Sequence, residues 1–410
     1  MEQQKGIQYI DHFILFCFCV LVIFLPIAHT ETIRAFSISI PAGLWIIKAI
    51  LRRQWLWDRT PLDIPILLFT FVAGLSLITA VDCKYSLEEL IGDWVLPVLL
   101  FYMVVNNFRG EQIKYLLGAL LLGNLLMVSY GIYDFFHRGG SLFTYQVRAG
   151  SLHSGFGTFS TYLITILPYL LVAGFFVRKV SGRLGLACLL LLNFFALYLT
   201  HARGAWVAAA ILLLMVGWKF LPKKILLPSV GAAFLLFFFL APQTVIKHHT
   251  GLNSPGRPAA SIETGQARWE LTKFCLERIK ENPFQMLGYG QRSFVKKYRD
   301  FYLQYKGALL WHAHNVFLNL ALQTGLQGLA IFCFLIYKII KYSYGRANSV
   351  NSSLAKYFLM ATFMMVITFF VRNLSDDFFI DDAALLFWFL CGAAVSMQAG
   401  WVAKKDAIVA

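Results

Sequence analysis

The feature that most restricts how this chain can fold is a series of apolar blocks, each long enough to cross a lipid bilayer. A membrane-spanning helix needs about 20 such residues. Hydrophobic residues make up 59% of the 410-residue sequence and charged residues only 14%, whereas a soluble domain carries about 25% charged residues. We therefore predict an all-α polytopic membrane protein.

Twelve blocks are predicted to span the membrane. The first ends without the small-residue pattern of a cleavage site, so we expect a retained span rather than a signal peptide. The blocks lie near residues 11–29, 33–51, 62–80, 89–106, 113–134, 154–177, 184–200, 204–221, 225–242, 314–340, 355–371 and 383–402.

The basic residues between these blocks fix the expected orientation. With the N-terminus inside, fifteen Lys and Arg residues fall in cytoplasmic connections and six in the short outer connections. This asymmetry is the positive-inside rule, and it accounts for much of the net charge of +15. We therefore expect membrane lipids rather than nucleic acid as partners, and a location in the bacterial inner membrane.

One outer connection is much longer than the others. Residues 1–242 would hold nine spans, residues 243–313 a periplasmic loop, and residues 314–410 the last three spans and a cytoplasmic tail. The loop contains eleven Lys or Arg and five Asp or Glu, an excess that suits anion binding. Within it, helical spacing of apolar residues predicts an amphipathic helix from Gln266 to Glu281, which Asn282 and Pro283 terminate.

Two histidines lie just before the tenth span, in the segment Trp311-His312-Ala313-His314-Asn315. A histidine titrates near neutral pH, so either one is a candidate general base. A second interpretation is that they are polar residues capping a helix. A third is a zinc site, but the sequence offers no further Cys/His cluster for the remaining ligands.

Arginines mark three other outer positions. Arg203 stands in a connection of almost no length, where a cation is costly unless it meets an anion or water. Arg268 lies in the predicted loop helix, and Arg148 precedes the sixth span. A guanidinium binds phosphate oxygens in pairs, which suits a diphosphate; the alternative for each is a solvated or lipid-facing charge. The last outer connection adds Arg372 and four acids, Asp376, Asp377, Asp381 and Asp382, which could orient a histidine or bind a sugar hydroxyl.

Taken together, these motifs resemble the O-antigen ligase and polymerase superfamily. They are Arg203-Gly-Ala, Arg268-Trp, Pro283-Phe-Gln-Met-Leu-Gly-Tyr-Gly290, and His312-Ala-His314-Asn315 followed by Gly325 and Gly328. The motifs cover roughly residues 145–330, and the layout of spans with one large outer loop extends the likeness to the whole chain.

The resemblance implies a glycosyltransferase that moves a glycan from an undecaprenyl-diphosphate carrier to an acceptor hydroxyl, with no metal and no other cofactor. Arg203 and Arg268, with Arg148 as a third candidate, would bind the diphosphate. His314 would be the base, with His312 as its alternative. Most similar is the O-antigen ligase of lipopolysaccharide biosynthesis, whose acceptor is a lipid A-core sugar.

Other functions remain open at this point. A polymerase of the same superfamily would join carrier-linked repeat units, and other members glycosylate proteins. A transporter of lipid-linked glycans would also need outer-face arginines, but it would need no general base.

Overall fold

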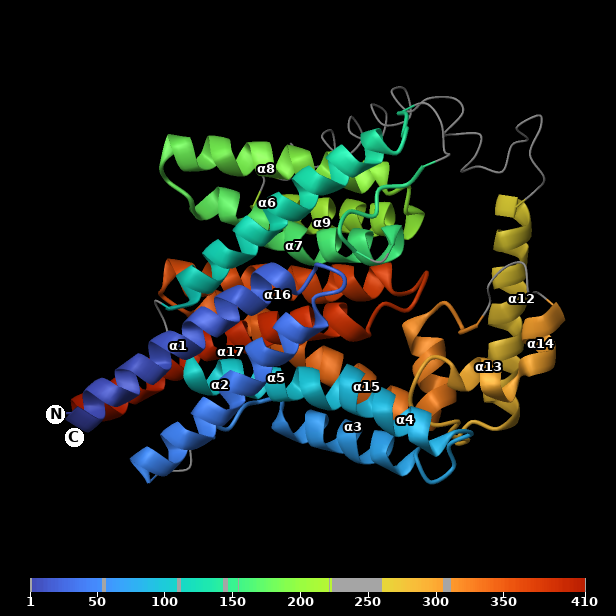
Figure 1. Cartoon of the computed structure of the whole chain (residues 1–410), viewed down its shortest axis with the longest axis horizontal. Coiled ribbons are helices and arrows are strands. Elements are labelled where there is room, and N and C mark those ends of the chain that lie inside the picture. Colours follow the sequence, from blue (N-terminus) through green and yellow to red (C-terminus); the bar gives the residue numbers. More distant parts are fainter. Residues whose placement is uncertain are drawn as a thin grey trace.

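The computed structural model describes residues 2–53, 57–108, 112–142, 147–153, 155–220, 222, 260–304 and 311–409. Within these ranges every regular element is a helix, which confirms the all-α prediction. Eight of the described helices are long and apolar enough to cross a membrane. The chain is thus a polytopic helical membrane protein, and Figure 1 shows most of its long helices running side by side as one bundle.

These eight helices coincide with eight of the predicted spans. The first four are α1 (Glu2–Phe24), α2 (Glu31–Arg52), α6 (Ile113–His137) and α7 (Phe156–Phe176). The other four are α8 (Val180–Leu199), α9 (Arg203–Phe220), α15 (Val316–Ser349) and α16 (Ser353–Arg372).

The four remaining predicted spans do not correspond to described helices that meet the same criteria of length and apolar composition. The third corresponds to the shorter α3 (Asp63–Leu75). The fourth is a continuous helical run of α4 (Cys83–Leu90), the π-helical turn η1 (Ile91–Val95) and α5 (Leu96–Asn107). The twelfth corresponds to α17 (Asp381–Val409). The ninth, 225–242, lies outside the described residues, so the total of twelve stays a prediction.

Burial separates the inner helices from the outer ones. Most of α7 and α16 is buried inside the protein, and the two helices pack on each other. By contrast only 22% of α2 and 17% of α8 is buried inside the protein, as expected of helices that face lipid. The core therefore lies around α7 and α16, and the connections at their ends are held by a rigid centre.

Three helices stand at the end of the bundle opposite the two chain termini (Figure 1): α12 (Ala260–Glu281), α13 (Ser293–Lys297) and α14 (Arg299–Gln304). The predicted loop helix is present as α12. It ends at Glu281 as expected and begins six residues earlier than Gln266. Its apolar face, which includes Leu271 and Cys275, is buried against α15 and the segment after α12. The helix therefore packs on protein, and the start of the predicted loop, 243–259, lies outside the described residues.

A break in α15 holds the segment between α12 and α13 in place. Gly325 has φ 72° and ψ 174° inside this helix, a conformation that costs glycine far less than other residues. The break leaves backbone groups without helical partners. The carbonyl of Leu322 accepts a hydrogen bond from Leu287 N at 3.0 Å, and Leu326 N donates to the carbonyl of Pro283 at 2.9 Å. The Pro283–Gly290 motif and the glycine after it are thus parts of one junction.

Candidate functional site

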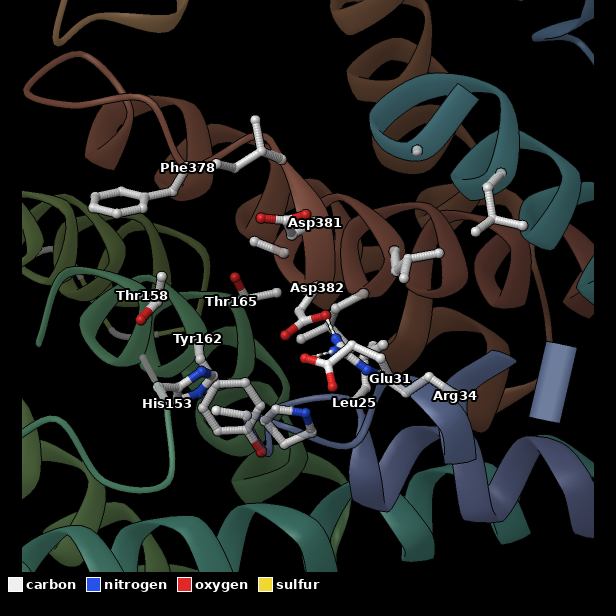
Figure 2. A pocket seen from close by; sticks show the side chains of 18 of the residues that line it. Leu25, Glu31, Arg34, His153, Thr158, Tyr162, Thr165, Phe378, Asp381 and Asp382 are labelled. Carbon is white, nitrogen blue, oxygen red and sulfur yellow. Dashed lines mark ion pairs between the residues drawn. The ribbon is translucent and has the colours of Figure 1, made fainter. Parts of the chain in front are cut away.

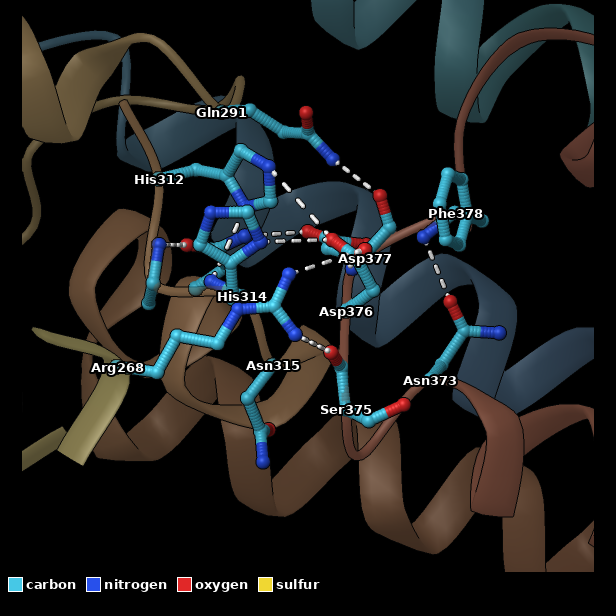
Figure 3. Close-up of polar contacts among 12 residues, drawn as sticks. Arg268, Gln291, His312, His314, Asn315, Asn373, Ser375, Asp376, Asp377 and Phe378 are labelled. Atoms are coloured by element: carbon cyan, nitrogen blue, oxygen red, sulfur yellow. Dashed lines mark hydrogen bonds and ion pairs between the residues drawn. The ribbon is translucent and has the colours of Figure 1, made fainter. Parts of the chain in front are cut away.

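His314 and Asp376 form a close pair where the segment before α15 meets the connection between α16 and α17 (Figure 3). His314 Nδ1 lies 2.9 Å from Asp376 Oδ1. Burial raises the pKa of Asp376, but the hydrogen bond from His314 and the positive charges nearby outweigh it, so that pKa lies below its usual value. An ionised carboxylate only accepts hydrogen bonds. The Nδ1–H of His314 therefore donates to Asp376.

The second ring nitrogen of His314 then carries the lone pair. This Nε2 atom is buried and has no hydrogen-bond partner among the described residues. Leaving a buried polar atom unpaired costs about 1–3 kcal/mol. A carboxylate that fixes one imidazole nitrogen and leaves the other as acceptor is the arrangement of a general base. A substrate hydroxyl would supply the missing partner.

The backbone of His314 is strained, and the next residue, Asn315, caps the helix that follows. His314 has φ 48°, a left-handed conformation that costs roughly 1–3 kcal/mol in a residue other than glycine. Asn315 is the N-cap of α15, and its side-chain oxygen accepts from Phe317 N at 2.9 Å. The helix cap is therefore Asn315, and the two histidine rings are free of that task.

His312 lies beside His314 but in a different environment. Its ring centroid is 4.1 Å from that of His314, and its Nδ1 accepts the backbone N–H of His314 at 3.1 Å. Burial, followed by the charge of His314, lowers the pKa of His312 to about 3. So weakly basic an imidazole is a poor acceptor of a hydroxyl proton, and the geometry favours His314 over His312 as base.

The same three side chains could in principle hold a metal ion. The sequence offered no third ligand, but the structure brings Asp376 to His312 and His314, with ligand atoms within 4.8 Å of one another. Two ligands of one tetrahedral zinc would stand roughly 3.3 Å apart, given bonds of about 2.0–2.1 Å. The 2.9 Å between His314 Nδ1 and Asp376 Oδ1 is instead a normal hydrogen-bond length.

Cations gather next to this pair. Burial, followed by neighbouring positive charges, lowers the pKa of Arg148 to about 10. Those charges are the guanidinium groups of Arg203, Arg268 and Arg372. The fold thus brings together all three arginines selected from the sequence and adds a fourth. Because like charges repel at close range, a bound anion would stabilise the cluster.

Arg268 connects the cluster to the histidine pair. It projects from α12, its Nη1 donates to the carbonyl of Ser375 at 3.2 Å, and its Nη2 lies 4.0 Å from Asp376 Oδ2 (Figure 3). Its side chain is still 42% exposed. Donors on the outer side of the guanidinium therefore remain accessible to a ligand that enters beside His314.

Arg148 and Arg372 are held more firmly. Arg148 Nη2 donates to the carbonyl of His201 at 3.0 Å, and its guanidinium lies 3.8 Å from the ring centre of Phe156. Arg372 is only 4% exposed, and its Nη1 donates to Ser375 Oγ at 3.1 Å. Buried charges in an apolar bundle are costly, and cations kept there indicate a functional need.

Two residues of the site were not assigned from the sequence. Asp376 was one of four acids in the last outer connection, with nothing to mark it, and Arg372 was placed in the same connection without a role. Asn319 of α15 contacts both the connection that carries Asp376 and the histidine segment. Its Nδ2 donates to Asp377 Oδ2 at 2.6 Å, while its Oδ1 accepts from Ala313 N at 2.8 Å. The amide thus helps to join the acidic connection to the histidine segment.

Gly204 lies where the start of α9 meets this connection. A Cβ built there would overlap Ser375 Oγ, lie 3.0 Å from Ser375 Cβ and lie 3.4 Å from Arg372 Nη1. We expect Gly204→Val to displace the 372–376 connection and lower activity by at least about tenfold, since small misplacements of catalytic groups have large effects. Steady-state kinetics checks this. Gly185→Val on α8, where a Cβ would meet nothing, is the matched control and should retain full activity.

A protein-family model described as O-antigen ligase matches residues 187–333 of this chain. The matched region runs from α8 through the break in α15, so it contains Arg203, Arg268 and both histidines, whereas Arg148 and Asp376 lie outside it. No curated protein matches the sequence.

Proposed function

We propose that this chain is a member of the O-antigen ligase family whose model matches residues 187–333, and that it transfers a glycan from undecaprenyl diphosphate to a sugar hydroxyl of the lipid A core. The observation that carries the proposal is the His314–Asp376 pair beside four arginines. One part of this site can take a proton from a hydroxyl, and the other can stabilise a diphosphate as it leaves.

The reaction follows from these two halves. His314 Nε2 accepts the proton of the acceptor hydroxyl while its oxygen attacks the anomeric carbon of the donor sugar. The bond from that carbon to the diphosphate breaks, and the diphosphate departs with its negative charge. Attack from the side opposite the leaving group inverts the anomeric centre. Asp376 stabilises the imidazolium that forms, as a carboxylate does in other base–carboxylate pairs.

The diphosphate leaving group needs fixed positive charge more than it needs a proton. Arg203 and Arg268 are the proposed diphosphate ligands, with Arg148 and the buried Arg372 adding to the local positive potential. The carrier's lipid tail would lie among the membrane helices. The active site would then face the periplasm, at the end of the bundle where α12 stands.

We expect Arg203→Ala and Arg268→Ala to raise the donor KM and lower kcat/KM by at least about tenfold each. The lysine variants should recover only part of the loss, because lysine keeps the charge but not the paired donors of the guanidinium. Kinetics with varied donor at saturating acceptor measures this. Full recovery in the lysine variants would show that charge alone suffices and that paired hydrogen bonds are irrelevant.

The proposed reaction proceeds without a metal. We expect the rate of glycan transfer to be unchanged in excess EDTA, since His314 and Asp376 are bonded to each other and arginines stabilise the leaving group. Loss of activity in EDTA that zinc restores would instead assign His312, His314 and Asp376 as metal ligands.

Ligase and polymerase share this chemistry and differ in acceptor. The test supplies purified protein with a carrier-linked glycan and two competing acceptors, a lipid A-core glycolipid and a second carrier-linked glycan. Mass spectrometry of the products identifies the acceptor. Extension of the lipid A core supports the ligase, and extension of the carrier-linked glycan would assign a polymerase.

A further inference from the structure

A cavity is lined in part by the connection that carries Asp376, at Phe378 and Ile380. It has a volume of about 490 Å³, within the usual range for ligand pockets. Its walls come from the α1–α2 connection, α2, α7, η1 and the start of α17 (Figure 2). None of its lining residues has a role in the proposed proton transfer or diphosphate binding.

The polar part of this cavity carries a net negative charge. Arg34 forms ion pairs with Glu31 and Asp382, drawn as dashed lines in Figure 2. Asp381 also lines the cavity. One guanidinium therefore faces three carboxylates, the reverse of the arginine cluster near His314. A phosphate would be repelled here, whereas the hydroxyl groups of a neutral sugar would find carboxylate acceptors.

Two buried atoms in this wall are without hydrogen-bond partners among the described residues. They are Arg34 Nε and His153 Nε2. Burial and the nearby charge of Arg34 lower the pKa of His153 to about 3, so its ring is neutral at physiological pH. A neutral imidazole can exchange a hydrogen bond with a hydroxyl, and a guanidinium N–H can donate to one. Both orphaned atoms therefore suit a hydroxyl-bearing ligand.

The other walls are aromatic and aliphatic. The rings of Tyr162 and Phe378 line the cavity, and sugar faces commonly pack on such rings; Leu25, Ile38 and Leu385 add an apolar surface. A polar region next to an apolar one fits an amphiphile with a sugar headgroup.

We infer that this cavity binds a neutral sugar unit of the acceptor glycolipid. The inference rests on the proposed function, because it assigns the acceptor to this cavity and the donor diphosphate to the arginines. Phe378 lines the cavity and follows Asp376 by two residues, so their Cα atoms are at most about 7 Å apart. A glycan docked here has its next sugars within reach of His314.

Filling the cavity tests this inference. Gly92 lines it, and a Cβ at this position would meet no atom within 4 Å. Gly92→Trp should therefore obstruct the cavity without forcing the backbone to move. Gly43→Trp on α2 is the matched control, because Gly43 is also an exposed helical glycine with open space at its Cβ but is not part of the cavity.

The full-length protein in lipid nanodiscs would be assayed for transfer and, separately without donor, for binding of a lipid A-core glycolipid. We expect Gly92→Trp to weaken glycolipid binding and raise the acceptor KM by at least tenfold, with the donor KM unchanged. Dodecyl glucoside should compete for this binding and dodecyl phosphate should not. Gly43→Trp should behave as the wild type.

The outcomes separate the two proposals. Normal transfer with an unchanged acceptor KM in Gly92→Trp would overturn the cavity assignment and leave the function intact. If the wild type binds the glycolipid but transfers no glycan, and Gly92→Trp abolishes that binding, the cavity assignment stands and the proposed function is overturned. Competition by dodecyl phosphate but not by dodecyl glucoside would show that the cavity takes an anionic headgroup, contrary to the inference.

Discussion

Replacing His314 with alanine lowers the rate of glycan transfer by about 10²–10⁴-fold, the usual contribution of a positioned general base. The side chain removed carries the buried Nε2 atom that has no hydrogen-bond partner within the described structure. Because the arginines that would hold the diphosphate stay in place, the donor should still bind. The measurement is kcat at saturating donor and acceptor, together with a direct donor-binding assay.

The control is His12→Ala, which removes an exposed histidine of α1 whose Nδ1 is hydrogen-bonded to the carbonyl of Gln8. That variant should transfer glycan at the wild-type rate. Wild-type activity in His314→Ala would rule out this histidine as base. Loss of activity together with loss of donor binding would point to a structural defect, which the melting temperature of the purified variant would reveal.

Replacing Asp376 with asparagine should lower kcat by about 10²–10⁴-fold as well, while changing the donor KM little. The carboxylate accepts the Nδ1–H of His314, with 2.9 Å between His314 Nδ1 and Asp376 Oδ1. This hydrogen bond keeps the proton on Nδ1. An asparagine amide can donate to Nδ1 instead, which favours the other tautomer and takes the lone pair from Nε2. Ring nitrogen chemical shifts of labelled histidine would report this change of tautomer directly.

A double variant sharpens this test. If Asp376 acts through His314, the His314→Ala, Asp376→Asn protein should be no slower than His314→Ala alone, since residues that act as a unit are not additive. Asp300→Asn, an exposed acid of α14, serves as the control. Independent, multiplying losses in the double variant would contradict a shared role.

The sequence predicted the parts of this architecture that depend on long apolar runs. Eight spans are present where expected, because twenty uncharged residues in succession leave few alternatives to a membrane helix. The end of α12 before Pro283 was also predictable, since proline cannot continue a helix. The apolar runs did not predict the π-helical turn at η1 or the break at Gly325, because both depend on packing against distant segments.

The residues of the candidate site were also predictable only in part. Arg203 stood out because a charge beside a membrane span is costly, and His314 because a histidine titrates near neutral pH. Arg148 and Arg268 were candidates because a guanidinium suits a diphosphate. Asp376 could not be told from Asp377, Asp381 and Asp382, which follow it within six residues. The structure distinguishes them by their partners. Asp376 is hydrogen-bonded to His314, Asp377 to Asn319, and Asp382 forms an ion pair with Arg34 in the cavity that Phe378 lines. Such partners are set by tertiary contacts, which a single sequence does not record.

The central claim is that this protein transfers a glycan from its carrier, rather than moving the carrier across the membrane. The most direct measurement uses the purified full-length protein in proteoliposomes, with an undecaprenyl-diphosphate-linked glycan and a lipid A-core glycolipid. The account predicts a new glycolipid whose mass is increased by the glycan, an inverted anomeric linkage and one undecaprenyl diphosphate released per transfer. Movement of intact donor between leaflets without any such product would contradict it.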